Sequence, residues 1–302
     1  MTGNQPPELP PAVAAERREI DGRAGRTSYY VAGDGAPLLL IHSINAAGSV
    51  YEVKPLFERY RNTRRVYAVD LPGFGFSERS RRDYTVALYT DAMHDVLDTI
   101  VEQTGVRRID ALALSLSSEF LARAATDRPD AVRTLTFVTP TGFRQGSHKL
   151  RGQEGSTREV PGLHRVLTVG LWREGLYGLL TKPSVIRYFL ERTWGSKDID
   201  EDLWKYDVLT TRQPGASHAP YAFLSGRLFS ADIREVYERI EQPVFMPHGT
   251  RGDFRDFSEA DWTRSRDNWT VEAFDTGALP FFEQPEHFFT SYDAFLARHA
   301  QE

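Results

Sequence analysis

Short apolar runs alternate with longer amphipathic segments along the first half of the chain. Four runs have the length and apolar content of buried strands, at residues 38–41, 65–70, 108–114 and 134–139. The segments between them repeat apolar residues every three or four positions, which is the spacing of one helix face. They predict helices over residues 50–60, 85–103 and 117–128. This alternation is typical of a parallel sheet with right-handed helical crossovers.

The alternation stops near residue 142. Between residues 142 and 242 no strand pattern is visible, and aromatic residues are frequent instead. Strand character returns at residues 243–246 and 268–274. A segment of about a hundred residues is far too long for an ordinary loop. We therefore expect one α/β core over residues 17–141 and 243–302, with a helical cap inserted over residues 142–242, before the last two strands.

Composition and charge exclude several classes of partner. The chain has 37 Lys and Arg against 42 Asp and Glu, a net charge of −5, so it has no excess of basic residues to bind nucleic acid. It contains no cysteine, which excludes disulfides, thiolate metal sites and a cysteine nucleophile. No histidine pair has metal-ligand spacing, and no Gly-x-Gly-x-x-G turn opens a helix after the first strand. We therefore expect neither a metal nor a cofactor.

The N-terminal end carries no recognisable targeting signal. Residues 1–16 are rich in Pro and Ala, lack the charged start and apolar stretch of a secretory signal, and are expected to form a mobile tail. The longest aliphatic run, residues 38–41, is far shorter than the ~20 residues that cross a bilayer. These features predict a cytoplasmic protein with no membrane partner. The oligomeric state stays open.

Ser115 lies between a predicted strand and a predicted helix, in the sequence ALSLS at residues 113–117. In a nucleophile elbow, a serine on a strained strand-to-helix turn presents its hydroxyl above the sheet. The positions two before and two after must be small, because the strand and helix backbones nearly touch there. Glycine is usual at both positions, whereas Ala113 and Ser117 stand here. The alternative interpretation is an ordinary serine N-cap in an α/β crossover.

From about residue 28 to its C-terminus, the chain resembles the α/β-hydrolase superfamily, in its capped, lipase- and haloperoxidase-like branch. Residues 70–77 (DLPGFGFS) match the family's Asp-x-Pro-Gly-x-Gly-x-Ser loop, and residues 41–43 (IHS) resemble its His-Gly turn. The resemblance implies the α/β-hydrolase fold, a mostly parallel sheet flanked by helices, with Ser115 as nucleophile. It also implies an oxyanion hole formed by backbone amides. The implied donors are the amides of Leu116 and of Ser43 or Ile44.

The rest of the family's catalytic triad is incomplete in this chain. The resemblance implies Asp253 as the acid after the strand at residues 243–249, one position later than the usual spacing. The alternative for Asp253 is a solvated carboxylate in a turn. The histidine turn is intact as a frame, but Ala278 occupies the histidine position. A methyl group cannot accept a proton from Ser115, so the hydroxyl lacks a general base. The same frame would surround Ala278 whether the histidine was replaced or never present.

Other side chains are candidates for base or ligand contact. His248 is the nearest histidine to the expected site, and its alternative role is a packed residue at a strand end. The aromatic residues of the cap suit a mostly apolar pocket for a small molecule, although they could equally form the cap's own core. The candidate ligand contacts are His42, Asn45, Trp172, Tyr177, Trp194 and His248.

Two functions remain open from the sequence. The first is a serine hydrolase-like protein that binds a carboxylic ester or related small acyl substrate between Ser115 and the cap. Because the triad is incomplete, its hydrolysis would be weak or atypical. The alternative is a non-hydrolytic protein that binds a small apolar ligand or promotes an elimination or cyclisation.

Overall fold

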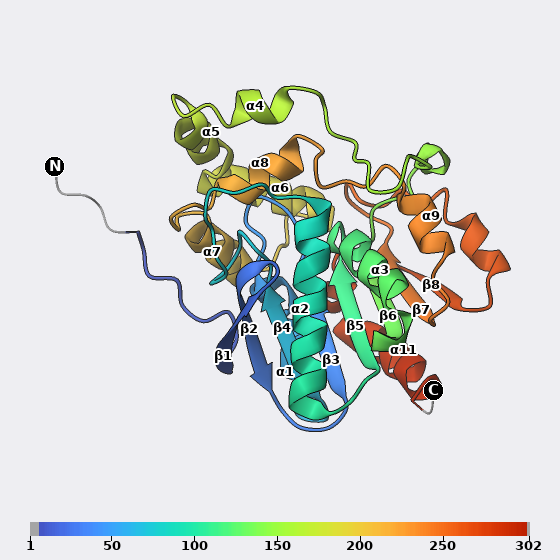
Figure 1. Cartoon of the computed structure of the whole chain (residues 1–302). Coiled ribbons are helices and arrows are strands. Elements are labelled where there is room, and N and C mark those ends of the chain that lie inside the picture. The colour runs from blue at the N-terminus through green and yellow to red at the C-terminus, as the bar shows by residue number, and fades with distance from the viewer. Residues whose placement is uncertain (1–5, 301–302) are drawn as a thin grey trace.

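The computed structural model describes residues 6–300 and contains one eight-stranded sheet in the order β1-β2-β4-β3-β5-β6-β7-β8 (Figure 1). Strands β3 to β8 are parallel, and β1 and β2 pair antiparallel at one edge. The expected mostly parallel sheet flanked by helices is therefore confirmed. The strands are β1 (Glu16–Gly22), β2 (Gly25–Ala32), β3 (Pro37–Ile41), β4 (Arg65–Asp70), β5 (Ile109–Leu114), β6 (Val132–Val138), β7 (Val244–Gly249) and β8 (Trp269–Phe274).

The two strands that the pattern did not predict, β1 and β2, form the antiparallel edge. Strand β1 has the sequence ERREIDG, and most of its residues are exposed. An edge strand that faces water on both sides needs no apolar run, so its sequence resembles that of a polar loop. By contrast, all five residues of β3 are buried, as expected for a central parallel strand covered on both faces.

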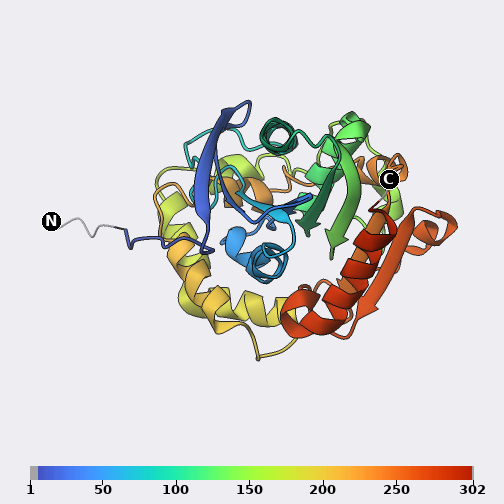
Figure 2. The same cartoon turned by 90° about the horizontal axis from the view of Figure 1, so that it is seen from below.

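Helices cover both faces of the sheet, and the strand side chains alternate between them. Leu39 and Ile41 of β3 pack in the cluster formed with α2 and α3, whereas Leu38 and Leu40 pack with α1 and α11. Figure 2 shows α1 and α11 on the face of the sheet opposite α2. These helices are α1 (Lys54–Tyr60), which follows η1 (Val50–Val53), α2 (Val86–Thr104), α3 (Ser117–Asp127), α10 (Pro280–Glu283) and α11 (Pro285–Arg298).

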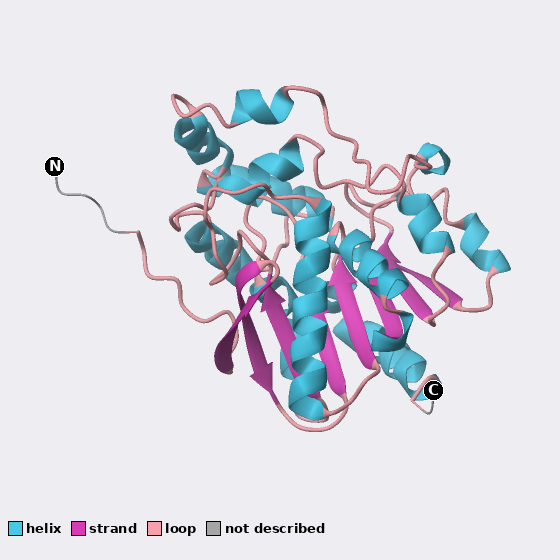
Figure 3. Cartoon of the chain, in the orientation of Figure 1, coloured by secondary structure: helices cyan, strands magenta, loops and turns pink. Residues whose placement is uncertain are grey.

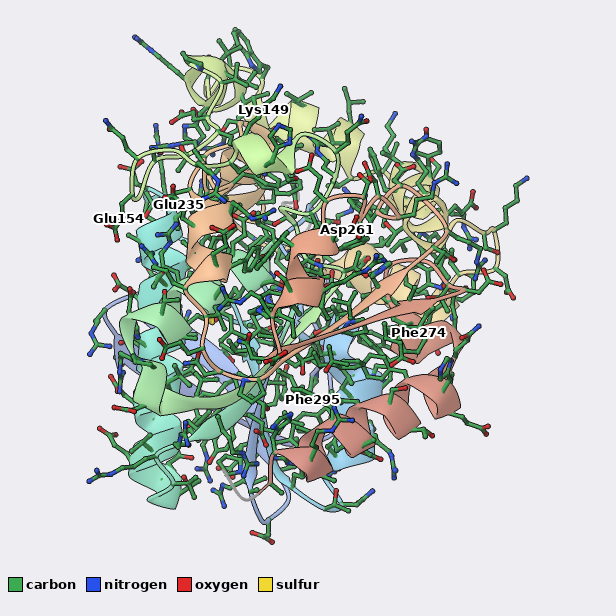
Figure 4. All side chains as sticks on the ribbon, turned by 90° about the vertical axis from the view of Figure 1, so that its right-hand side faces the viewer. Lys149, Glu154, Glu235, Asp261, Phe274 and Phe295 are labelled. Carbon is green, nitrogen blue, oxygen red and sulfur yellow. The ribbon has the colours of Figure 1, made fainter. Side chains whose placement is uncertain are left out.

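The C-terminal helix closes the core beside the last strands. Phe295 of α11 and Phe274 of β8 belong to the same apolar cluster, which Figure 4 shows from the side. The sequence pattern indicated only the end of this helix, residues 292–298, whereas α11 begins seven residues earlier, at Pro285. A proline at the first helical position suits the start of a helix, because its missing N–H would have no partner there.

A helical segment lies between β6 and β7, where the sequence predicts an insertion. It is described here as the inserted segment, residues 142–242. Figure 3 shows most of its helices beyond the C-terminal ends of the parallel strands. The last one, α9, instead packs on α3 and contributes Ile233 and Val236 to the core. The helices are α4 (Leu163–Leu167), α5 (Arg173–Leu180), α6 (Pro183–Trp194), α7 (Glu201–Thr210), α8 (His218–Leu224) and α9 (Ile233–Glu238).

The N-terminal segment differs from the expected mobile tail. Residues 1–5 lie outside the described part, but Leu9 and Val13 are buried in the core cluster with α1 and α11. The amide of Ala12 donates to Tyr30 Oη at 3.1 Å, and Tyr206 Oη donates to the Pro10 carbonyl at 2.9 Å. The prolines suggested a mobile segment, whereas the buried apolar side chains of Leu9 and Val13 pack it against the core.

No helix within residues 6–300 combines the length and the hydropathy needed to cross a bilayer.

Candidate active site

Ser115 occupies a strained turn between β5 and α3. Its φ is +50°, a conformation that among the non-glycine residues of 6–300 only Thr139 shares, at φ +47°. Left-handed backbone is uncommon for residues with a side chain and is found mainly where function requires it. The amide of Ser115 donates to the Val138 carbonyl at 2.9 Å, which fixes the turn on β6. The N-cap of α3 is Leu116, so Ser115 is not the helix cap of the alternative interpretation.

The residue two positions after Ser115 connects the turn to a neighbouring loop. Ser117 is fully buried, and its hydroxyl donates to the His42 carbonyl at 2.6 Å. A serine therefore fits where glycine is usual, because the loop after β3 supplies an acceptor for its hydroxyl. This bond joins the turn at Ser115 to the loop that was expected to form the oxyanion hole.

The loop at residues 70–77 is held by the carboxylate of Asp70. Asp70 Oδ1 accepts from the Val50 amide at 3.0 Å, and Oδ2 accepts from the Phe76 amide at 3.0 Å. Gly75 has φ +48°, and a Cβ at this position would collide with the Asp70 carboxylate. The motif thus specifies a compact support beneath the loop after β3 and supplies no group that reaches Ser115.

Of the three backbone amides expected in an oxyanion hole, that of Ser43 already donates a hydrogen bond within the protein. The Ser43 amide donates to Glu52 Oε2 at 2.7 Å, so its inclusion as an oxyanion donor was wrong for this conformation. The amides of Ile44 and Leu116 donate no hydrogen bond to protein within residues 6–300. Their role as oxyanion donors stays a prediction.

Glu52 is the main residue of this region for which the sequence analysis predicted no role. It lies on η1, is 5% exposed, and also accepts from Ser43 Oγ at 3.0 Å and from Asn45 Nδ2 at 2.7 Å. Burial raises the pKa of the Glu52 carboxyl, and these donors partly oppose the rise. A sequence signal existed, since Glu52 precedes the buried Leu56 by four residues and so shares its helix face.

His42 and Asn45, expected to contact a ligand, brace the loop instead. His42 is fully buried, its Nε2 accepts from the Leu71 amide at 3.0 Å, and its Nδ1 donates to the Ser43 carbonyl at 2.6 Å. Burial lowers the pKa of His42 to about 4, so the ring is neutral at pH 7. Asn45 Oδ1 accepts from the Ala47 amide at 2.6 Å, and its amide group binds Glu52. Neither side chain has a free polar group for a ligand.

Asp253, the expected triad acid, binds a cation of the inserted segment. Both of its carboxylate oxygens accept from the Arg192 guanidinium, Oδ1 from Nη2 at 2.8 Å and Oδ2 from Nε. Its backbone amide also donates to the Arg192 carbonyl, at 3.0 Å. The Asp253 side chain is 42% exposed. Within the described residues, no hydrogen bond connects it to Ser115. The carboxylate is therefore directed to the end of α6, not toward the serine.

Ala278 lies beside the strand next to that of Ser115. Its carbonyl accepts from Thr139 Oγ1 at 2.7 Å, and its amide donates to the Thr193 carbonyl at 3.0 Å. The loops after β7 and β8 thus both attach to the C-terminal end of α6. At this position, where the resemblance implies a histidine, the backbone is held by both bonds and the side chain is a methyl group.

His248, the candidate base, and His287 of α11 both have other partners. His248 stacks on Phe257 with 4.1 Å between ring centroids, and its Nδ1 lies 3.1 Å from the Gly249 carbonyl. It lines a surface cavity of about 540 Å³ that does not include Ser115. His287 pairs with Glu272, and its Nε2 is 3.0 Å from Oε1. No hydrogen bond joins these two described histidines to Ser115. His248 is a packed residue at the end of β7, which is the alternative role that the sequence left open.

The three expected aromatic contacts are placed differently from one another. Trp172 is 44% exposed on the outer turn before α5, so its assignment to a pocket beneath the inserted segment was wrong. Trp194 is buried against Phe282, with ring centroids 5.7 Å apart, and serves as a core residue of the inserted segment. Tyr177 is buried, and its hydroxyl donates to the Ala46 carbonyl at 2.9 Å. Only Tyr177 reaches the loop after β3.

Comparisons with known proteins agree with this architecture. A family model described as the alpha/beta hydrolase fold matches residues 36–155. A pimeloyl-[acyl-carrier protein] methyl ester esterase from Nitrosomonas europaea is 26% identical over 272 residues, which cover 87% of this chain and 96% of that protein.

Two solved structures extend the comparison to the complete fold. A meta-cleavage product hydrolase from Pseudomonas fluorescens superposes with a TM-score of 0.70 at 17% identity, covering 93% of this chain and 97% of the other. A carboxylesterase from Bacillus subtilis superposes with a TM-score of 0.67 at 18% identity, covering 94% and 92%. The sheet order, the family model over residues 36–155 and these solved neighbours together show that the chain has the α/β-hydrolase fold.

Proposed function

We propose that the chain is a serine hydrolase-like protein that binds a small carboxylic ester or related acyl compound at Ser115, under the inserted segment acting as a cap, and hydrolyses it weakly or atypically. The observation that carries this proposal is the left-handed backbone of Ser115, with φ +50°. Such strain persists only when the surrounding structure enforces it, and it serves to present the hydroxyl above the sheet.

The proposed chemistry begins with the carbonyl oxygen of the ligand. The amides of Leu116 and Ile44 would donate to this oxygen and stabilise negative charge that develops on it. Attack by Ser115 Oγ on the carbonyl carbon gives an acyl-serine as the acyl–oxygen bond of the ester breaks. The alcohol leaves with a proton from water, and water later hydrolyses the acyl-serine to the acid. The attack also releases the proton of the serine hydroxyl. Because Ala278 cannot accept that proton, it passes to water, and the step is slow at neutral pH.

The named relatives support the substrate class. The Nitrosomonas europaea protein is named as an esterase of a methyl ester, and the Bacillus subtilis structure is that of a carboxylesterase. Both names describe an acyl–oxygen bond as the site of reaction. We transfer to this chain only that common chemistry, a carboxylic ester or its analogue.

A second candidate is a protein that binds a small apolar ligand without hydrolysing it, or that promotes an elimination or cyclisation. Two contacts favour it: the ion pair that directs Asp253 toward Arg192, and the bond that engages the Ser43 amide with Glu52. Both remove groups that a hydrolase of this fold would use on the substrate. A site of this kind acts by binding and positioning alone.

The experiment introduces a histidine at position 278 and removes the ion pair that holds Asp253. The variant Ala278→His, combined with Arg192→Ala, supplies an imidazole and releases Asp253 from its ion pair. Hydrolysis of p-nitrophenyl butyrate is then expected to rise by about 100-fold or more over the wild type, which is the usual contribution of a general base. The matched control is Ala278→His with Arg187→Ala, because Arg187 is also on α6 but pairs with Glu201.

Three outcomes separate the candidates. A gain in the Arg192 variant that disappears with Ser115→Ala supports the proposal, provided that the Arg187 control gives less. If neither double variant gains activity while both stay folded, the second candidate is favoured. Efficient hydrolysis by the wild type would show that another group acts as the base.

A further inference from the structure

The end of α4 and the turn that leads to α5 expose a group of apolar side chains. Val166, Val169, Leu171 and Trp172 are 55%, 37%, 88% and 44% exposed, respectively. We call this group the 166–172 turn. Single exposed apolar residues are common on proteins, whereas four within seven residues concentrate apolar surface on one short segment. Figure 1 shows α4 and α5 at the top edge of the molecule, beyond the ends of the strands.

The backbone of the 166–172 turn is held by its own hydrogen bonds. Trp172 Nε1 donates to the Val166 carbonyl at 3.1 Å, and the Arg173 amide donates to the Val169 carbonyl at 3.0 Å. On the inner side of α5, Tyr177 is buried and bound to the loop after β3. The apolar side chains therefore point outward from an ordered, anchored turn.

The charge around this turn is opposite in sign to that of the whole chain. Residues 160–192 contain five Lys and Arg against two Glu, whereas the chain has a net charge of −5. Arg165 precedes the turn and Lys182 follows α5; both are exposed, and neither forms an ion pair in the part of the chain that the structure describes. Exposed Leu, Val and Trp side chains next to unpaired cations are typical of segments that lie in a membrane interface.

We propose that the 166–172 turn docks on the surface of an anionic lipid bilayer. Its apolar side chains would enter the boundary between headgroups and acyl chains, while Arg165 and Lys182 contact lipid phosphates. A second copy of the chain fits this surface poorly, since a symmetric contact would place like cations opposite one another. The sequence-based expectation of no membrane partner concerned a spanning segment, and this mode of binding needs none.

The test measures flotation of the full chain with vesicles. Binding is expected to vesicles of phosphatidylcholine and phosphatidylglycerol in equal parts, and to fall with added salt and with pure phosphatidylcholine. The double variant Val166→Ser with Leu171→Ser is expected to bind about tenfold more weakly. The matched control is Val106→Ser, because Val106 is 37% exposed and follows α2 at the opposite end of the sheet.

A second variant tests the charged flank without touching an apolar residue. Arg165→Gln with Lys182→Gln is expected to weaken binding to anionic vesicles and to abolish most of its salt dependence. The proposal is overturned if the wild type does not float with anionic vesicles, or if the apolar double variant floats like Val106→Ser. It is equally overturned if sedimentation shows a wild-type dimer that the Val166 and Leu171 changes dissociate. None of these readouts depends on Ser115.

Discussion

Ser115 retains a left-handed backbone although the described structure supplies it with no general base. The hydrogen bonds that hold it come from the backbone of β6 and from the hydroxyl of Ser117, two residues later. The elbow geometry thus depends on the sheet and its loops, and it does not require the triad. The strained turn at Ser115 can therefore form whichever residue stands at position 278.

The strain at Ser115 predicts a difference between two variants that both lack the hydroxyl. Ser115→Gly removes the Cβ that disfavours φ +50°, whereas Ser115→Ala keeps it. We expect the glycine variant to be the more stable of the two by about 1 kcal/mol, after allowance for the flexibility of glycine in the unfolded chain. Urea denaturation measures the difference, and equal stabilities would show that the turn is not strained.

The buried carboxyl of Asp207 on α7 is expected to make the stability of the fold depend on pH. Burial raises its pKa well above the usual value, the carboxyl of Glu52 adds to the rise, and Asp200 acts in the same direction. The folded state therefore holds this proton when the unfolded chain has already lost it, so stability falls as pH rises above the ordinary pKa of aspartate. Asp207 Oδ1 has no hydrogen-bond partner within the described residues.

The variant Asp207→Asn removes this penalty without changing the size of the side chain. Its Tm is expected to equal that of the wild type near pH 4 and to exceed it increasingly toward pH 8. Thermal melts at a series of pH values test the sign. A wild type that gains stability over the variant as pH rises would contradict the assignment, because it would mean that Asp207 is stabilised as a carboxylate.

Among the elements, the central strands were predictable and the antiparallel edge was not. Strands β3 to β7 have apolar runs because most of their residues are buried, and the sequence predicts these five as well as the partly exposed edge strand β8. Strand β1 is an exposed edge with charged residues, and the pattern contains no signal for it. The direction of Asp253 was equally unpredictable, since it depends on Arg192, which lies 61 residues earlier in the chain and meets it only in the folded structure.

The N-terminal segment gives a prediction at the scale of an element. Val13 is 2% exposed and packs in the core cluster with α1 and α11. Val13→Ala is expected to cost about 2 kcal/mol of stability, the usual effect of removing two buried methyl groups. Glu8→Ala, at an exposed position of the same segment, is expected to change little. Equal effects of the two changes in chemical denaturation would mean that the segment is not packed.

At the scale of the molecule, α6 connects the two loops that carry Asp253 and Ala278, the positions expected for the acid and the histidine. The carbonyls of Arg192 and Thr193 accept from the amides of Asp253 and Ala278. The inserted segment is therefore joined to the site through the backbone of both loops. The resemblance over residues 70–77 predicted the fold, and the sequence at residues 113–117 predicted the turn at Ser115. The placement of Asp253 and Ala278 depends on the contact with α6, which no local motif encodes.

The most direct measurement of the central claim is labelling of Ser115 by a fluorophosphonate probe at pH 7.5, detected by mass spectrometry of the intact chain. The probe reacts with serines that a neighbouring base activates. We expect no labelling of the wild type above the level of Ser115→Ala over an hour, because no described side chain accepts the Ser115 proton. Rapid, stoichiometric labelling that Ser115→Ala abolishes would contradict the account and require a base within reach of Ser115.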